Sequence, residues 1–460
     1  MKLNLLRVTL AVLLVFIPLY PKFPLAFATG SQVAFRLDDI IVSLSLLVWI
    51  GYQIRTGFPI LRQKMSWLII AYWLSLIASL LNAFLVYQTT PSTQLFLHTL
   101  RRLEYMSLFF ITYSALSTKD FKFPLPFAIL AFFGVFAYGM GQKYFQFPVV
   151  STMNFEFAQG QLLQMDVWTR ISATFAGHYD LAAYLSIFSA LALGLSFLTK
   201  RLTINLVLKL SWVLSFYLLT QTASRISTFA YWGGSVLMLM LIRKFIWIVP
   251  VSALMITSFV TSADLNQRLL ATIPALRGTF SPSTTTAPTP TPTVLLLPTP
   301  TPVPNVPTEA PLIPTPTIFR HLAPTHPPID VDAGVARSGE IRFKVEWPRA
   351  LRAFEKNRLL GTGAGSLGLA TDNDYLRLLG ETGALGTVTF LLIFVHLAHL
   401  SWRARRQPLT AIFLSSIVIF WANAIFIDVF EASKTAYLFW ILIGVFYYHL
   451  TAPNHDRFKT

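Results

Sequence analysis

The stretch "LIIAYWLSLIASLLNAFLVY" (68–87) runs for 20 residues without a charged side chain. A helix of about 20 apolar residues crosses the hydrocarbon core of a bilayer, which is about 30 Å thick. In that core the backbone needs internal hydrogen-bond partners, and a helix supplies them within one segment. A second run, "LAAYLSIFSALALGLSFL" (181–198), has the same character. Together the two runs predict a helical protein that crosses a membrane more than once.

The composition extends this prediction to the whole chain. Of its 460 residues, 54% are hydrophobic and 12% are charged, about half the charged share of an ordinary soluble protein. We predict an all-α, polytopic integral membrane protein with about twelve transmembrane helices and a large extracytoplasmic loop before the tenth. The predicted spans lie near residues 4–20, 37–54, 67–87, 99–117, 124–141, 180–199, 203–221, 227–242, 245–262, 382–401, 408–428 and 434–450.

The formal net charge of +16 indicates the orientation of the chain. With the N-terminus inside, nearly all the basic excess falls on the inner segments, whose acids are Asp120 and Asp456. This is the positive-inside pattern, so the charge does not indicate a nucleic-acid partner. Both termini are predicted to be cytoplasmic. The first span lacks an A-x-A-like cleavage site, so we interpret it as a retained helix.

The predicted organisation has three parts. Residues 1–263 hold helices one to nine with an outer loop at 141–179, residues 264–380 form a long extracytoplasmic loop, and residues 381–460 hold the last three helices. Within the long loop, residues 281–328 are dominated by proline and threonine. Proline removes backbone donors and this composition cannot build a packed core, so we predict an extended or disordered spacer.

The end of the long loop looks ordered. "WPRALRAFEKN" (347–357) has helical spacing, which places Trp347, Leu351 and Phe354 on one face. We expect this helix to lie back on the membrane surface.

A second helix is predicted in "DNDYLRLLGETG" (372–383), with Asp372 or Asp374 as its N-cap. Between the two helices, "GAGSLG" (363–368) matches the dinucleotide-binding fingerprint. That fingerprint requires a preceding strand and a βαβ unit, which are not predicted here. The glycines therefore indicate a tight turn, either purely structural or with amides that face a ligand.

Several charged residues lie at the predicted outer ends of early spans. Asp38 and Asp39 follow Arg36, and either an ion pair, a helix cap or a catalytic acid explains them. Arg101 and Glu104 are three residues apart on a predicted helix and are placed to pair with each other.

Arg170 and Arg225 indicate a functional site more strongly. Both lie at the predicted outer face, close to membrane depth, where ionisable residues are expensive. Arginine stays charged, and its planar fork matches phosphate oxygens. The structural alternative is salt bridges to Glu156 or Asp180, and Asp180 also suits the N-cap of the sixth span. His178 is a general base, a structural hydrogen-bonding group or neither.

The chain contains no cysteine, which excludes disulfides, thiolate metal sites and a cysteine nucleophile. Its eight histidines form no cluster with metal-ligand spacing. We therefore predict neither a metal site nor a cofactor.

Three stretches together resemble the O-antigen ligase and O-antigen polymerase superfamily. They are "RISATFAGHYDLAAYL" (170–185), "TASRIST" (222–228) and "LRAFEKNRLLGTGAGSLG…DNDYLRLLGETGALG" (351–386). Members of this family are polytopic enzymes of the bacterial cytoplasmic membrane with a large outer loop between late spans. They act on undecaprenyl-diphosphate-linked glycans.

The resemblance implies inverting, metal-independent glycosyl transfer at the outer face of the membrane. A glycan would leave undecaprenyl diphosphate and join a glycan or lipid-linked acceptor, among membrane lipids. Arg170 and Arg225 would hold the diphosphate and stabilise its developing charge.

The resemblance also assigns the base and the acceptor side. The ligases carry a histidine where this chain has Asp372, and a carboxylate can also take a proton from a hydroxyl. Asp372 is therefore our first candidate for the base, and His178 is the second. Tyr375 and Glu381 would shape the acceptor side. Losing the ligase histidine favours a polymerase or another glycan transferase over a ligase to lipid A.

Three alternatives stay open at this point. A glycosyltransferase with a polyprenyl-monophosphate-sugar donor would use Asp38 and Asp39 as its acids. A transporter of lipid-linked glycan would use the same arginines without chemistry, although no internal repeat is evident. A non-catalytic scaffold would use the Pro/Thr arm to carry a surface partner.

Overall fold

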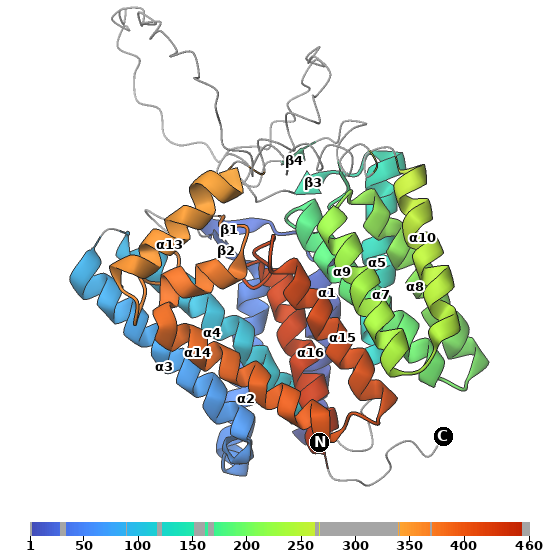
Figure 1. The fold of residues 1–460 in the computed structure, drawn as a ribbon. Coiled ribbons are helices and arrows are strands. Elements are labelled where there is room, and N and C mark those ends of the chain that lie inside the picture. Colours follow the sequence, from blue (N-terminus) through green and yellow to red (C-terminus); the bar gives the residue numbers. More distant parts are fainter. Residues whose placement is uncertain are drawn as a thin grey trace, which may run out of the picture.

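The computed structural model describes residues 2–27, 34–88, 90–116, 122–150, 162–163, 170–262, 266, 339, 341–368 and 370–452. The Pro/Thr spacer at 281–328 and residues 151–161 and 164–169 of the outer loop 141–179 lie outside the described residues. The described chain forms a bundle of helices (Figure 1). Its strands make two small antiparallel hairpins, β1 (Pro24–Phe27) with β2 (Ala34–Arg36) and β3 (Val149–Val150) with β4 (Leu162–Leu163). The prediction of an all-α protein is confirmed.

Every predicted span coincides with a helix. These helices are α1 (Lys2–Leu19), α2 (Leu37–Thr56), α3 (Lys64–Asn82), α4 (Ser92–Ala115), α5 (Pro124–Phe145), α7 (His178–Leu198), α8 (Leu202–Gln221), α9 (Arg225–Leu241), α10 (Ile248–Thr261), α14 (Asp374–Arg403), α15 (Pro408–Asn423) and α16 (Ser433–Thr451). Short turns of helix extend them or connect them: η1 (Pro59–Arg62), η2 (Ala83–Tyr87), η3 (Phe245–Trp247) and η4 (Ile341–Glu346).

Among the described residues, six helices are long and apolar enough to cross a membrane. They are α2, α3 with its continuation through η2, α5, α7, α8 and α14. Their outward faces are apolar: Leu47 and Ile54 on α2, for example, are each 64% exposed. An apolar surface of this kind would be costly in water and is favourable against lipid tails. The chain is thus a membrane-embedded helical protein, and the number of twelve crossings stays a prediction.

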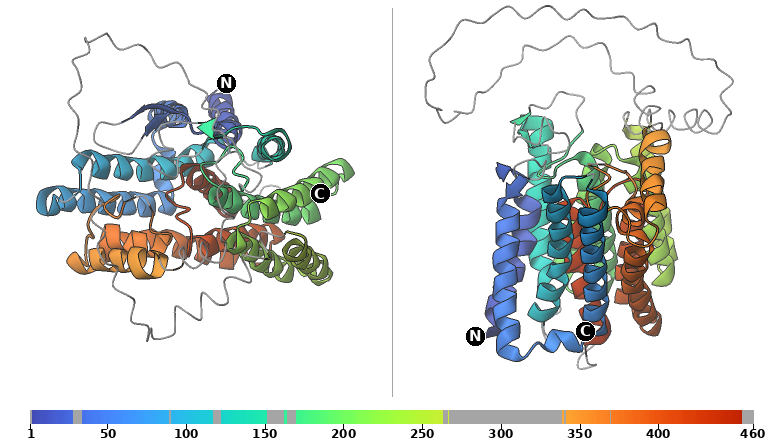
Figure 2. Two further views of the ribbon diagram at one scale, coloured as in Figure 1. Left: turned by 90° about the horizontal axis from the view of Figure 1, so that it is seen from above. Right: turned by 90° about the vertical axis from the view of Figure 1, so that its left-hand side faces the viewer.

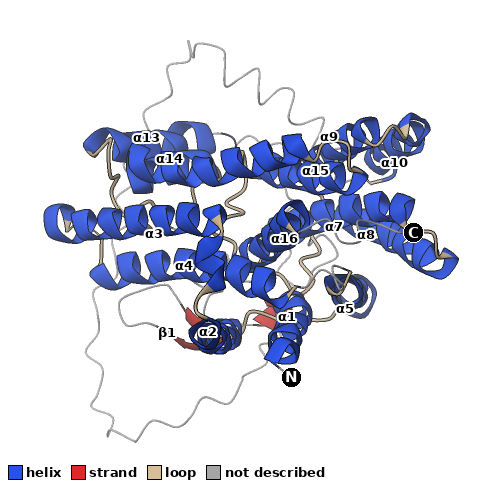
Figure 3. Cartoon of the chain, turned by 90° about the horizontal axis from the view of Figure 1, so that it is seen from below, coloured by secondary structure: helices blue, strands red, loops and turns tan. Residues whose placement is uncertain are grey.

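Helices α7 and α16 form the centre of the bundle. Most residues of both helices are buried, whereas α2 and α10 bury few. Seen from below, α16 and α7 lie between one row with α14, α15 and α9 and another with α1 and α5 (Figure 3). Helix α4 packs on α16, and α3 packs on α14 (Figure 2). Both central helices begin at the end of the bundle that carries α13 (Figure 1).

Helix α14 contains a break that joins the predicted short helix to the tenth span. Gly383 has φ 64° and ψ −167°, which are not helical values. The break frees backbone groups, and the preceding loop satisfies them: Gly363 N–H donates to the Glu381 carbonyl, and Ala384 N–H donates to the Arg358 carbonyl. Residues 380 and 381, the predicted boundary of the long loop, both lie in the part of α14 before this break.

The "GAGSLG" segment (363–368) forms the expected tight turns. Gly363, Gly365 and Gly368 all have positive φ, and a Cβ on Gly363 would lie 2.6 Å from the Ala83 side chain. The Gly363 amide bonds to Glu381, and the Gly368 amide bonds to the Gly365 carbonyl. These two amides are used within the protein, which favours the structural reading of the turn.

Helix α13 (Trp347–Lys356) confirms the helix predicted at 347–357, but its buried face differs. Ala350 and Ala353 are buried, whereas Leu351 is 44% exposed. The small residues let α13 approach α14 closely, since a Cβ on Gly380 would lie 2.7 Å from the Ala350 carbonyl oxygen. The face of α13 that is buried is therefore the one whose small residues allow the two backbones to approach closely. The spacing of large apolar side chains does not reveal this face.

The predicted helix caps were wrong by one to three residues. Asn373 caps α14 by accepting a hydrogen bond from the Leu376 amide at 2.9 Å, in place of Asp372 or Asp374. Asp180 lies in the first turn of α7, whose N-cap is Gly177. At the start of α2, Asp39 accepts from the Arg36 amide at 2.9 Å. The bonds at the starts of α14 and α2 are local, each joining residues three positions apart.

The eleventh span also ends earlier than predicted. Helix α15 stops at Asn423, and residues 424–432 form turns before α16 begins. The Asn423 side chain accepts from the Ser227 hydroxyl at 2.6 Å and donates to the Ile419 carbonyl at 2.9 Å. This end releases Asp428 from the helix and exposes its carboxylate to neighbouring backbone amides.

Candidate functional site

Arginines from three distant segments gather around Tyr179, the second residue of α7. Arg170 lies before α7, Arg225 is the first residue of α9, and Arg342 lies in η4. The Tyr179 phenol interacts with the guanidinium groups of Arg170 and Arg342, and the Arg170 guanidinium lies 6.0 Å from its ring centre. Arg170 and Arg342 are also close enough to Arg225 to repel its charge. We call Arg170, Arg225 and Arg342 the arginine cluster.

The arginine cluster lies at the end of the bundle where α7 and α9 begin, which is also the end that carries α13 (Figure 1). Like charges held together are costly unless an anion offsets them. A phosphate group has the charge and the acceptor oxygens to do so, and guanidinium forks match its geometry.

His178 is tied to the arginine cluster. Its Nε2 is the partner of Arg170 Nη1, and the centre of its ring lies 4.1 Å from that of Tyr179, with the two planes tilted by 41°. Because a guanidinium can only donate, Nε2 accepts and the imidazole proton lies on Nδ1. A nitrogen already occupied by a cation is a poor proton acceptor. The structure therefore favours a role for His178 in orienting Arg170.

Asp372 faces the arginine cluster from the other side. Its Oδ2 accepts from Nε and from Nη2 of Arg342, each at 2.8 Å, and one third of its side chain (33%) is exposed. Burial raises the pKa of the Asp372 carboxyl above its ordinary value; Arg342 opposes this shift, and the negative charge of Asp428 adds to it. A raised pKa makes the carboxylate a better proton acceptor. Burial also raises the pKa of the nearby Glu346.

Glu381 lies in a buried ionic network below this face. It is fully buried and contacts Arg102 through Oε2 and Arg377 through Oε1, the latter at 3.4 Å. Arg102 also donates from Nε to Glu431 at 2.7 Å, and Arg377 Nη2 donates to Asp428 at 3.0 Å. Both carboxylate oxygens of Glu381 are thus engaged, and its ion pair with Arg102 links α14 to α4. The acceptor-side role that the resemblance implied for Glu381 stays a prediction.

Tyr375, the other predicted acceptor-side residue, points toward α15. Its hydroxyl donates to the Trp421 carbonyl at 2.7 Å, and the two rings lie 5.4 Å apart. Both residues line a cavity of about 80 Å³ that Arg102 and Glu431 also border. The structure thus brings Arg170, Arg225, His178 and Asp372 together, and places Tyr375 and Glu381 in the layer beneath them.

The acids at the start of α2 are separate from the arginine cluster. Nη2 of Arg101 lies 3.9 Å from Oδ2 of Asp39. Arg101 therefore pairs with Asp39 in addition to Glu104, its predicted partner. Asp38 is 1% exposed, and its two carboxylate oxygens have no hydrogen-bond partner within the described chain. Lys22, whose pKa burial lowers to about 8, lies close enough to Asp38 to interact with it.

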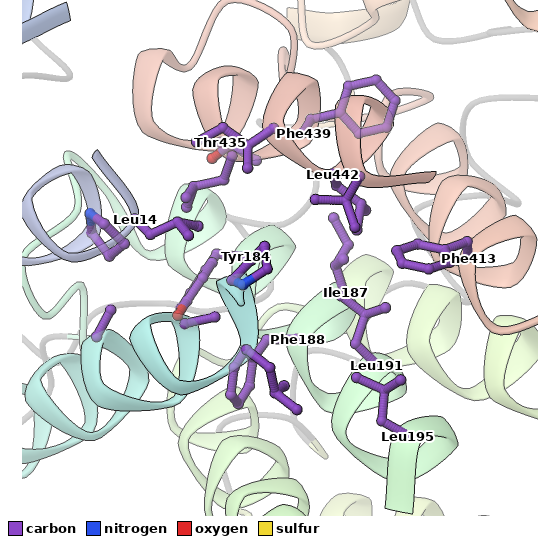
Figure 4. Close-up of a pocket in the computed structure, with 18 of the residues that line it drawn as sticks. Leu14, Tyr184, Ile187, Phe188, Leu191, Leu195, Phe413, Thr435, Phe439 and Leu442 are labelled. Carbon is purple, nitrogen blue, oxygen red and sulfur yellow. The ribbon is translucent and has the colours of Figure 1, made fainter. Parts of the chain in front are cut away.

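An apolar cavity of about 190 Å³ runs between α1, α5, α7 and α16 (Figure 4). Tyr184, Phe188 and Leu191 of α7 face Thr435 and Leu442 of α16 across it. Its lining is almost wholly hydrocarbon and aromatic, with Lys122 as its charged residue, so it suits lipid tails.

Within the described residues, no three histidine or carboxylate side chains gather in a way that would hold a metal ion. The absence of a metal or cofactor from the reaction stays a prediction.

Sequence reasoning missed two residues of this site, Arg342 and Asp428. Arg342 is one of several basic residues in a long loop, and Asp428 fell inside the predicted eleventh span. Neither belongs to a spaced motif. An ionisable residue at the end of an apolar run is a signal that could have directed attention to Asp428.

No protein family model matches the chain, and no curated protein shows significant sequence similarity to it.

Proposed function

We propose that this protein is a glycan transferase of the bacterial cytoplasmic membrane that uses an undecaprenyl-diphosphate-linked donor at the outer face. Its products would belong to cell-envelope polysaccharide, such as O-antigen of lipopolysaccharide or an exopolysaccharide. One observation carries the proposal: the arginine cluster gathers Arg170, Arg225 and Arg342 from segments far apart in sequence, beside the carboxylate of Asp372. The membrane-embedded fold supplies the lipid-facing surroundings that such a donor needs.

The reaction uses this geometry in a single displacement. The hydroxyl oxygen of the acceptor attacks the anomeric carbon, and the bond from that carbon to the diphosphate oxygen breaks with its electron pair. Undecaprenyl diphosphate leaves with that additional negative charge, and the acceptor proton passes to the Asp372 carboxylate. Donors already aimed at the developing charge lower the barrier without reorganisation at the moment of reaction.

Arg342 has two contacts in this scheme. It holds Asp372 at 2.8 Å and lies against Tyr179 within the arginine cluster. It thereby connects the group that takes the proton to the groups that take the negative charge. Arg170, oriented by His178, and Arg225 complete the cluster on the diphosphate side.

Purified protein in lipid vesicles, supplied with a lipid-linked glycan donor and a glycan acceptor, tests the proposal. Arg170→Ala, Arg225→Ala and Arg342→Ala should each lower kcat on the order of 100-fold, the usual cost of one donor to developing charge. Arg→Lys at the same positions should recover little, because lysine lacks the fork. Arg352→Ala on the exposed face of α13 is the matched control and should be fully active.

Two outcomes would overturn the proposal. Full transfer by the three alanine variants would remove the arginine cluster from the reaction. Wild-type protein that moves the donor across the bilayer without forming product would be a transporter. In a deletion strain, single repeat units left on undecaprenyl diphosphate would indicate a polymerase, and polymer left there would indicate a ligase.

A further inference from the structure

Asp428 binds three successive backbone amides. Its Oδ2 accepts from the amides of Thr371 and Asp372 at 2.8 and 3.1 Å, and its Oδ1 accepts from the Asn373 amide at 3.3 Å. Successive amides that converge in this way form a concave site for an anion. Here the anion is a side chain of the same protein, 57 residues beyond the first of these amides.

The turn that Asp428 binds is strained. Asp372 has φ +50°, in the left-handed region, which costs a non-glycine residue about 1–2 kcal/mol. Such a conformation persists only where the surroundings over-determine it. The hydrogen bonds from the three backbone amides to Asp428 supply such surroundings. The residue with the left-handed backbone, Asp372, is also the one whose carboxylate bonds to Arg342.

Asp428 is itself firmly held. Arg377 donates to its Oδ2 at 3.0 Å from within the ionic network below. The segment around Asp428 also exchanges backbone bonds with the start of α14: the Asp374 amide donates to the Ala424 carbonyl at 3.0 Å, and the Phe430 amide donates to Asp374 Oδ2 at 3.1 Å. The turn between α15 and α16 and the turn before α14 therefore form one interlocked unit.

From these contacts we infer that Asp428 is a positioning residue: it fixes the Thr371–Asn373 turn and thereby aims the Asp372 carboxylate at the arginine cluster. The inference rests on the proposed function, in which Asp372 takes the acceptor proton. Asp428 does not touch the reacting atoms in this scheme. It acts through the backbone of the turn, and a displacement of about 1 Å at a reacting group can cost on the order of 100-fold in rate.

Asp428 also affects Asp372 electrostatically. The charged groups that face Asp372 are Arg342 from η4, Arg377 from α14, Asp428 from the turn after α15, and Glu346 at the end of η4. Asp428 and Glu346 are negative and oppose ionisation of Asp372, whereas the two arginines favour it. Removing the charge of Asp428 alone should therefore lower the pKa of the Asp372 carboxyl.

The test compares Asp428→Asn and Asp428→Glu with wild type in the full chain in lipid vesicles. In Asp428→Asn, the backbone amides of residues 371–373 should undergo hydrogen exchange about tenfold faster than in wild type, because they lose hydrogen bonds. It should lower kcat roughly 10- to 100-fold with the donor KM little changed. The acidic limb of its kcat/KM profile should move to lower pH. Asp428→Glu keeps the charge and should lose kcat with the limb near that of wild type.

Glu431→Gln is the matched control. It removes a carboxylate from the same segment and breaks the pair with Arg102, but Glu431 makes no contact with the 371–373 turn. It should leave both the exchange of these amides and the acidic limb unchanged. This separates positioning from a general loss of stability.

The inference would be overturned if both Asp428 variants had the same kcat as wild type and the same hydrogen-exchange rates at residues 371–373. An acidic limb that Glu431→Gln shifts as far as Asp428→Asn would overturn it as well. Hydrogen exchange needs no catalysis, so it distinguishes this failure from that of the proposed function. If wild type transfers no glycan while Asp428→Asn still frees the turn, the proposed function fails and the structural role of Asp428 stands.

Discussion

Replacing Asp372 by asparagine should abolish glycan transfer and leave donor binding nearly unchanged. Asparagine keeps the size of the side chain and tolerates the left-handed backbone at φ +50°. It loses the negative charge and cannot take the acceptor proton. A positioned general base contributes about 10²- to 10⁴-fold, which corresponds to about 3–5 kcal/mol of transition-state stabilisation.

The same change should cost little stability. One third of the Asp372 side chain is exposed, so its ion pair with Arg342 is screened and contributes at most about 1 kcal/mol. The cap of α14 comes from Asn373, so the substitution leaves it intact. The two costs differ by several kcal/mol, and lost activity therefore cannot be attributed to unfolding.

The assay measures product formation and donor binding on the same vesicle preparation, with thermal unfolding as the stability control. Asp372→Glu and Asp372→His, which restore a proton acceptor, should keep part of the activity. An Asp372→Asn variant that transfers glycan at the wild-type rate would refute the assignment of the base.

The remaining predictions concern the electrostatics, the network, the helix break and the topology. Arg342 lowers the pKa of Asp372, and the reaction needs the ionised carboxylate; Arg342→Gln should therefore move the acidic limb of kcat/KM to higher pH, and a shift to lower pH would contradict this. Glu381→Ala should destabilise the protein by about 3–5 kcal/mol, because it leaves Arg102 and Arg377 buried without this partner; an unchanged Tm in detergent would count against the network. Gly383→Ala should cost on the order of 1–2 kcal/mol from its φ of 64° alone, and more because the new Cβ would lie 2.4 Å from the Leu359 carbonyl oxygen; Gly51→Ala, with no neighbour within 4 Å, is the control and should not lower the Tm. Reporter fusions after Arg62 and Arg406 should read as cytoplasmic and fusions near Thr285 as external; a cytoplasmic signal at Thr285 would place Asp372 and the arginine cluster on the wrong side for the proposed donor.

The sequence by itself determined where the helices lie. Apolar runs of membrane-spanning length are a local property, and every predicted span coincides with a helix. The helix at 347–357 and the glycine turns at 363–368 were likewise readable from local spacing. Arg170 and Arg225 could be recognised as candidates because each is a charged residue next to a long apolar run.

Only the tertiary structure decided which charged groups meet. Arg342 reaches Tyr179 and Asp372, and Asp428 reaches the turn before α14, across separations of 30 to more than 160 residues that no local pattern records. Glu381 was predicted as a site residue from its place in a motif, and the structure shows it buried between Arg102 of α4 and Arg377 of α14. The end of α15 lies five residues before its predicted position, at Asn423, whose side chain accepts a hydrogen bond from Ser227 of another helix. Apolar burial is nearly non-directional and can be read from composition, whereas ion pairs and hydrogen bonds depend on distances that exist only after the helices have packed.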